Sequence, residues 1–366
     1  MITRQRAKIK ENGTGLEIRL GYGRMTMNRF DEKYIFKIAD MEELDDIMGF
    51  IREYWNKDHI LANDKDFFLY EFQNGDKLNY FLARNKETNV IEAIMGFYPY
   101  QKEMKPKESC FSGGILKVYS KCAVPMLGVE MLRRIYALMQ QRAYIGNGAN
   151  PVTALPLETR VLRHHGGRHR HFYILDKRDE YKIAKIINQP EIMSSFCTLQ
   201  KPLTEYQNVE EMYQVFDDTA FRERIPYKDA WYVQKRYFSH PIYHYQMFGI
   251  GTKTVLVGRE VSQNGAKVFR LVDILGDVTE IRYAGAALRE LIGRNGYEYI
   301  DLYEHGVPED ALKEAGFVER TENDSKIIPN YFEPFVQKNI EIYYHTDAED
   351  AVIFKADGDQ DRPNFR

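Results

Sequence analysis

The chain has 366 residues, of which 44% are hydrophobic, 13% aromatic and 29% charged, with a formal net charge of −3. This composition excludes a disordered or collagen-like chain, and the length suggests two domains at roughly 150 residues each. The near-neutral charge argues against nucleic acid as a partner. The sequence contains no run of about 18 apolar residues, so no membrane span is predicted. The three cysteines are widely spaced, which excludes a disulfide framework and fits a cytoplasmic protein.

The first 30 residues are charged and interrupted by glycine, and we interpret them as an N-terminal extension outside the fold. After them, Asp40 and Glu43 have the spacing of a capping box at the start of an amphipathic helix. The patterns predict a strand, that helix, a β-hairpin, a strand, a helix and a strand, in this order, at 34–39, 41–55, 77–100, 113–120, 129–141 and 143–151.

The same order recurs in the second half. A strand, a helix, a hairpin, a helix, a strand, a short helix and closing strands are predicted at 193–199, 208–218, 254–275, 284–296, 297–306, 308–317 and 330–345. Asn264-Gly265 is a strong hairpin-turn signal. We interpret the repeat as two copies of one α/β unit, spanning 31–190 and 191–366.

This order of elements, found twice, resembles the GNAT N-acetyltransferase fold. In that family a turn of the form Gln/Arg-x-x-Gly-x-Gly/Ala binds the pyrophosphate of coenzyme A, and residues 282–287 match it, whereas 125–130 match only at Gly128. Gly316-Phe317 after a short helix and Asn150 after a strand are further points of resemblance. The resemblance covers about 34–366 and implies an α/β (α+β) fold of two tandem GNAT-like domains with mixed, mostly antiparallel sheets.

The stretch from WNKDHILA through NYFLARNKETNVIEAIMGF, at 55–97, and the tail KADGDQDRPN, at 355–364, also resemble GNAT-like proteins of bacterial surface-polysaccharide gene clusters. The resemblance implies an enzyme that transfers an acyl group from acetyl-coenzyme A, or another acyl-coenzyme A, by direct attack of an amine on the thioester. It implies an amino sugar or nucleotide sugar as acceptor and no metal, and it is compatible with a homodimer.

The resemblance places coenzyme A at one or both strand-to-helix turns. In the first half the candidates are Val118, Gly128, Val129, Glu130 and Asn150, although the carboxylate of Glu130 would repel phosphate and Asn150 before a proline also fits a simple turn. In the second half they are Arg282, Gly285 and Ala287. Either half could be only a scaffold.

Candidate acceptor residues are Trp55, His240 and Arg362, and candidate catalytic residues are His59, Asp357 and Asp359. An imidazole can accept a proton near pH 7, aromatic faces suit sugar rings, and carboxylates can orient an amine. Plain packing, or a frayed polar C-terminus, would explain the same residues.

In the family, a tyrosine about seven residues after the asparagine protonates the leaving thiolate. This chain has Leu157 there, so the acid is missing or comes from elsewhere.

Residues 163–171 contain four of the nine histidines and three arginines. A zinc site is not expected, because no carboxylate or cysteine is nearby in the sequence. A solvated basic turn and a phosphate-binding patch both remain open.

Two rival interpretations remain. One is a transferase with another donor, such as aminoacyl-tRNA, by resemblance to the tandem enzymes that build peptidoglycan cross-bridges. The other is a non-catalytic sugar-binding or scaffold protein, which the missing tyrosine favours.

Overall fold

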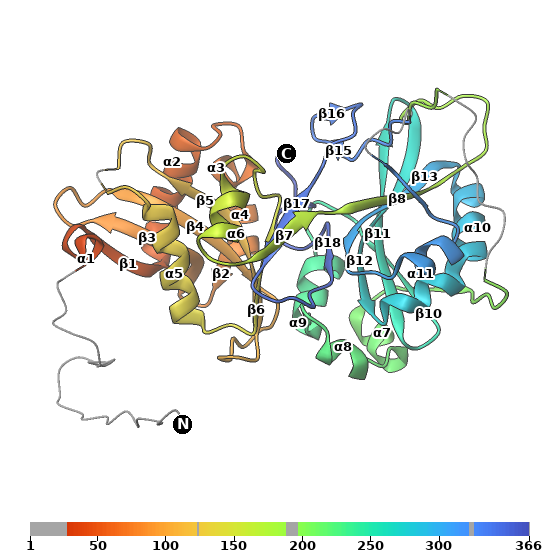
Figure 1. Cartoon of the computed structure of the whole chain (residues 1–366), viewed down its shortest axis with the longest axis horizontal. Coiled ribbons are helices and arrows are strands. Elements are labelled where there is room, and N and C mark those ends of the chain that lie inside the picture. Colours follow the sequence, from red (N-terminus) through yellow and green to blue (C-terminus); the bar gives the residue numbers. More distant parts are fainter. Residues whose placement is uncertain (1–27, 123, 188–196, 322–325, 366) are drawn as a thin grey trace.

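A computed structural model describes residues 28–122, 124–187, 197–321 and 326–365. The chain forms two mixed sheets of eight strands each, which lie side by side (Figure 1). Among the described strands, only one pair in each sheet is parallel, β5 with β6 and β12 with β13. The predicted fold class, two GNAT-like units with mostly antiparallel sheets, is therefore confirmed at the level of architecture.

The first sheet has the order β1-β3-β4-β5-β6-β17-β7, with β2 beside β3. Its strands are β1 Tyr34–Asp40, β2 Gln73–Asn74, β3 Lys77–Asn85, β4 Ile91–Pro99, β5 Cys110–Val118, β6 Ala143–Asn147, β7 His165–Arg168 and β17 Tyr343–Thr346. The helices of this half are α1 Arg29–Lys33, η1 Met41–Glu43, α2 Leu44–Tyr54, α3 Ile60–Asn63, α4 Lys65–Phe72, α5 Leu127–Met139 and α6 Ala154–Arg160.

The second sheet has the order β14-β8-β13-β12-β11-β10-β9, with β18 beside β13. Its strands are β8 Arg170–Leu175, β9 Leu203–Tyr206, β10 Gln246–Ile250, β11 Thr254–Gln263, β12 Ala266–Gly276, β13 Tyr297–His305, β14 Val318–Glu319 and β18 Ile353–Phe354. The helices are α7 Val209–Val215, α8 Thr219–Glu223, α9 Ala230–Val233, η2 Gln234–Phe238, η3 Val278–Ala284, α10 Gly285–Asn295 and α11 Glu309–Glu314, and a small hairpin is formed by β15 Tyr331–Phe332 and β16 Phe335–Val336.

Several local predictions are confirmed. The backbone N–H of Asp40 donates to Glu43, which completes the capping box before α2. Asn264 and Gly265 both have positive φ, as the two-residue turn between β11 and β12 requires. Of the predicted extension 1–30, residues 1–27 lie outside the described residues, but residues 28–30 belong to the fold, because Asn28 caps α1 and Phe30 is buried in the core under α5. The predicted strand at 193–199 falls mostly on 188–196, which also lie outside the described residues. In the second half of the chain, the first strand described is β9.

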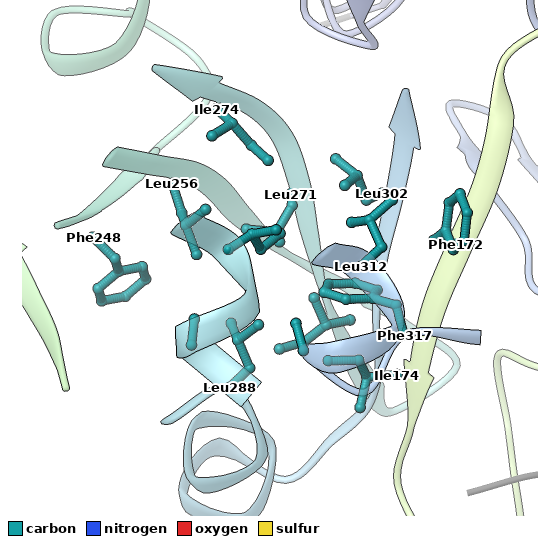
Figure 2. Packing of buried hydrophobic residues seen from close by; sticks show 14 of the residues in the cluster. Phe172, Ile174, Phe248, Leu256, Leu271, Ile274, Leu288, Leu302, Leu312 and Phe317 are labelled. Carbon is teal, nitrogen blue, oxygen red and sulfur yellow. The ribbon is translucent and has the colours of Figure 1, made fainter. Parts of the chain in front are cut away.

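The two sheets exchange strands. β8 comes from the first half of the chain but pairs with β13 and β14, and β17 comes from the second half but pairs with β6 and β7. Figure 2 shows Phe172 and Ile174 of β8 packed with Leu302, Leu312 and Phe317 in the core of the second sheet. Neither 31–190 nor 191–366 therefore holds all the strands of its own sheet.

Helices cover both faces of the first sheet, because successive side chains of each strand point to opposite faces and both faces are apolar. Tyr80 and Leu82 of β3 pack with α2, α3 and α4, whereas Phe81 and Ala83 pack with α5. A further core contains residues of both sheets, including Cys110 and Ile145 from the first, and it joins the two halves. Among the described residues, no helix has the length and apolar character to cross a membrane.

Candidate functional site

In each sheet, the two strands of the parallel pair are hydrogen-bonded over a few residues and then separate, which leaves a gap. β5 pairs with β6 only from Cys110 to Ser112, and from Gly113 the two strands separate. β12 and β13 likewise pair up to Leu271 and Leu302, and then separate. Such gaps leave backbone N–H and C=O groups of both strands without ladder partners, so another segment or a ligand must meet them.

The gap in the second sheet is closed by the chain itself. β18 pairs with β13 at Phe354 and Glu304, and the backbone N–H of Ala356 donates to the carbonyl of Val272 on β12 at 2.9 Å. This segment therefore occupies the space between β12 and β13.

The same segment then passes the gap in the first sheet. The Nδ2 atom of Asn147, at the end of β6, donates to the carbonyl oxygens of Phe354 at 3.0 Å and Asp357 at 2.8 Å. Gly358 has φ +73°, and a Cβ there would lie 3.3 Å from the carbonyl oxygen of Gly113. Asn147 was missed from the sequence because the resemblance pointed to Asn150.

Beyond Gly358 the chain lines a cavity of about 260 Å³ on the face of the first sheet that α2 and α4 cover. Its walls combine aromatic rings with polar groups, from Trp55, Asn56, His59, Leu61, Phe67, Glu71, Tyr98, Ile115, Tyr331, Asp359, Gln360, Arg362, Pro363, Asn364 and Phe365. The predicted residues Trp55, His59, Asp359 and Arg362 are thus brought together from two segments about 300 residues apart in the chain.

Arg362 is held in a fixed position in the cavity wall. Its guanidinium forms an ion pair with Glu71, its Nε donates to the carbonyl oxygen of Gly358 at 2.8 Å, and its Cζ lies 3.8 Å from the ring centre of Tyr98. Burial of the Glu71 carboxylate is thereby compensated by a charge-assisted bond.

The two predicted catalytic aspartates have different surroundings. Asp359 lines the cavity, accepts from Gln360 at 3.0 Å, and has no ion pair within the described part of the chain. Burial raises the pKa of Asp359 above its usual range. Asp357 lies outside the cavity lining, fully buried, and accepts from Tyr100 and Lys228 at 2.9 Å each. These contacts hold the C-terminal segment in place. Asp357 does not reach the cavity.

The two predicted histidines are held by backbone groups. His59 lines the cavity, but its Nδ1 accepts from the N–H of Leu61 at 3.2 Å and caps α3, and burial lowers its pKa. His240 lies behind the wall, with its Nε2 3.8 Å from Glu71, and burial lowers its pKa to about 2. Its Nδ1 accepts from the backbone N–H groups of Ile242 and Tyr243, at 3.2 and 2.9 Å, so neither imidazole has Nδ1 available as a proton acceptor.

The predicted coenzyme residues of the first half lie on the opposite, α5 face of the sheet. A Cβ on Gly128 would meet only Val118, at 3.4 Å. The repulsion expected from Glu130 is reduced, because its carboxylate pairs with Arg134 at 2.8 Å. Val129 is buried under the first turn of α5.

Asn150 forms a local turn. Its Oδ1 accepts from the backbone N–H groups of Val152 and Thr153, at 2.9 and 3.1 Å. This is the ordinary role of asparagine before a helix.

The corresponding turn of the second half matches the motif better in letters but is occupied by protein groups. The guanidinium of Arg282 pairs with Asp310 and Glu314 of α11, at 3.3 Å each. Gly285 is buried, and the side chain of Gln200 accepts from the N–H of Ala286 at 2.8 Å. Ala287 lines a cavity of about 230 Å³ beside β9 and β10. A phosphate here would have to displace these contacts.

The histidine run is not a solvated turn along its whole length. His165 is exposed, but three of its neighbours are buried. His164 lies against His345 and Glu158, His169 contacts Asn147, and His171 contacts Asp301. Glu158 thus supplies a carboxylate next to this run, which the sequence analysis did not find.

With the geometry described, the chain can be compared with known proteins. No family model and no curated protein matches the sequence. A GCN5-related N-acetyltransferase from Anabaena variabilis matches the structure with a TM-score of 0.50 and 8% identity, over 86% of this chain and 72% of that one. The fold is the GNAT fold, present twice. An N-myristoyltransferase from Saccharomyces cerevisiae, with bound myristoyl-CoA, matches with a TM-score of 0.45 and 10% identity, over 91% of this chain and 86% of that one.

Proposed function

We propose that the protein transfers an acyl group from acyl-coenzyme A to a primary amine, and that its first half is the catalytic unit. The observation that carries this proposal is the difference between the two gaps. The second is closed by β18, whereas the first borders a polar cavity of about 260 Å³. The first gap is therefore the place where we propose that the acyl group and the amine meet.

The donor binds on the α5 face. The start of α5 offers backbone N–H groups and the positive end of the helix dipole to a pyrophosphate. Gly128 leaves room for it there, and the pairing of Glu130 with Arg134 keeps the nearest carboxylate from opposing it. When bound, the coenzyme supplies an activated thioester carbonyl, and acetyl-coenzyme A is the donor that we propose.

The acceptor binds in the cavity on the other face. Trp55, Tyr98 and Tyr331 offer aromatic faces, while Asp359 and Asn364 offer hydrogen-bonding groups. The volume is somewhat below the roughly 300 Å³ at which pockets for drug-sized ligands begin, which suits a single ring. An amino sugar, free or nucleotide-linked, combines an apolar ring face with an amine, and surface-polysaccharide synthesis is the setting we propose.

The chain must remove a proton from the acceptor, because an ammonium ion is not a nucleophile. Asp359 is the carboxylate in the cavity wall that is without an ion pair in the described residues, so it accepts this proton, directly or through one water. Glu71 is less suited, since Arg362 pairs with it. Arg362 instead holds the segment that carries Asp359.

The test is calorimetric titration of the full chain with acetyl-coenzyme A. Gly128→Trp fills the second position of α5, and Ala286→Trp fills the same position of α10, so the two variants are matched. We expect micromolar binding by the wild type and by the Ala286 variant, and loss of binding in the Gly128 variant.

Two other results would overturn the proposal. Loss of binding only in the Ala286 variant would move the donor site to the second half. No heat and no thermal stabilisation of the wild type at millimolar acetyl-coenzyme A would favour another donor or a non-catalytic protein.

A further inference from the structure

Three side chains of types that can bind a metal converge at the first sheet, away from the cavity. Glu158 belongs to α6, His164 follows that helix, and His345 lies in the exchanged strand β17. The Nδ1 atoms of the two histidines are 3.1 Å apart, and Oε2 of Glu158 lies 3.8 Å from the first and 3.7 Å from the second. The point in their plane that is equidistant from these three atoms is about 2.1 Å from each, within the usual range of zinc–nitrogen and zinc–oxygen bonds.

The three groups are buried, with relative exposures of 5%, 7% and 5% for Glu158, His164 and His345. Oε2 of Glu158 has no hydrogen-bond partner within the described part of the chain. A buried carboxylate oxygen without a partner is costly, and only one proton can lie between the two facing Nδ1 atoms. A cation at the centre would accept lone pairs from all three atoms and remove this cost.

We propose that Glu158, His164 and His345 bind a divalent transition-metal ion of the zinc type. Two neutral imidazoles and one carboxylate are a known ligand set for Zn²⁺, whereas Mg²⁺ and Ca²⁺ prefer oxygen ligands only. Three protein ligands leave a fourth position, which a water molecule can fill. The site is separate from the acyltransfer proposal, because its residues do not line the cavity.

The surrounding backbone makes room for these side chains. His345 is paired with Gly146 of β6 on one side and Gly166 of β7 on the other. A Cβ on Gly146 would lie 2.0 Å from Nε2 of His345, and one on Gly166 would lie 2.8 Å from Thr159 of α6. Any larger residue at either position would displace the imidazole or the helix.

The ion would fasten the exchanged strand to the half that receives it. Glu158 and His164 precede the crossing between the sheets, whereas His345 lies about 180 residues later in the chain. A metal bond between them would act as a cross-link across the two halves. Removal of the ion is therefore expected to lower the melting temperature.

The experiment measures metal in the full chain, with any histidine tag removed. Metal content is determined after purification, and chelator-treated protein is then titrated with Zn²⁺ and with Co²⁺, whose visible absorption reports coordination. We expect one ion per chain and an increase of several degrees in melting temperature on Zn²⁺ addition. Glu158→Gln and His164→Ala should reduce affinity at least tenfold. His165→Ala, at the exposed neighbouring histidine, should bind like the wild type.

Two results would overturn the proposal. One is chelator-treated wild-type protein that folds, as judged by circular dichroism, and takes up neither ion at stoichiometric concentrations. The other is equal loss of binding in the His165 variant, which would place the ion on the surface of the histidine run. If the ligand variants do not fold, the wild-type titration alone decides. Metal content is read independently of acyltransfer, so failure of one proposal leaves the other standing.

Discussion

Arg362 lies with its guanidinium carbon 3.8 Å from the ring centre of Tyr98, which places the C-terminal segment directly on β4 of the first sheet. The same guanidinium pairs with Glu71 of α4, and the two charged side chains are 8% and 2% exposed. Arg362, four positions before the last residue of the printed chain, therefore helps to form the wall of the cavity.

The buried ion pair between Arg362 and Glu71 predicts a large loss of stability when one partner is removed. Arg362→Ala leaves the buried Glu71 carboxylate unpaired, so we expect the free energy of unfolding to fall by roughly 3–5 kcal/mol. Urea denaturation of Arg362→Ala, Glu71→Gln and the double variant gives the coupling between them. Asp45→Ala, which breaks the exposed pair with Lys65, is the control and should cost about 1 kcal/mol or less. Additive effects of the Arg362 and Glu71 substitutions would contradict the prediction.

Asp357 and Asp359 are two residues apart but should respond differently to removal of their charge. Asp359→Asn should lower kcat by roughly 10²- to 10⁴-fold, because proton transfer is lost, with a change in stability of about 1 kcal/mol or less. Thiol release from acetyl-coenzyme A with a panel of amino sugars measures kcat.

Asp357→Asn should do the reverse. It weakens the buried pairing with Lys228, which keeps its ion pair with Asp273, and should cost roughly 1–3 kcal/mol of stability, while the folded fraction keeps its kcat. An Asp359 variant with the wild-type kcat would exclude this residue as the proton acceptor.

The exchange of strands predicts that the halves do not fold separately. A fragment of residues 28–187 lacks β17 and exposes Phe172 and Ile174, which are 0% exposed in the intact chain. Each buried apolar side chain of this size contributes roughly 1.5–3 kcal/mol. We expect this fragment to aggregate alone and to be soluble when co-expressed with residues 197–366. Cooperative thermal unfolding of the fragment by itself would contradict this.

His171 predicts a loss of stability in acid. Its Nδ1 accepts from Arg320 at 3.0 Å and its Nε2 contacts Asp301 at 3.2 Å, so the folded protein holds the neutral ring. Burial lowers the pKa of His171 to about 4, against about 6.5 in an unfolded chain. Between these values the unfolded state binds a proton that the folded state does not, so stability falls as pH decreases from 6.5 to 4.

The size of this loss is about 3 kcal/mol for a shift of this magnitude. Urea unfolding at pH 7, 5.5 and 4 should show a smaller pH dependence for His171→Gln than for the wild type, whereas the exposed His165→Gln should retain the wild-type slope. Equal slopes for His171→Gln and the wild type would show that this histidine titrates normally in the folded protein.

The sequence by itself determined the local elements and their order. The apolar runs of β3 and β4 around the polar turn 85–89, the capping box at Asp40 and the Asn264-Gly265 turn each depend on neighbours within a few positions, so their patterns can be read without the fold. Because the same order occurs twice, it also predicted two related sheets. Trp55, His59, Asp359 and Arg362 were selected from single segments, and all four line the cavity.

Only the tertiary structure decided which strands pair, which turn is accessible and which carboxylates are anchored. Arg282 matches the motif but faces acidic side chains of α11, and Asn147 rather than Asn150 reaches the C-terminal segment. His345 meets His164 only because β17 joins the other sheet. Each of these contacts joins residues far apart in sequence. Packing and strand pairing between distant segments leave no periodic signal in the chain.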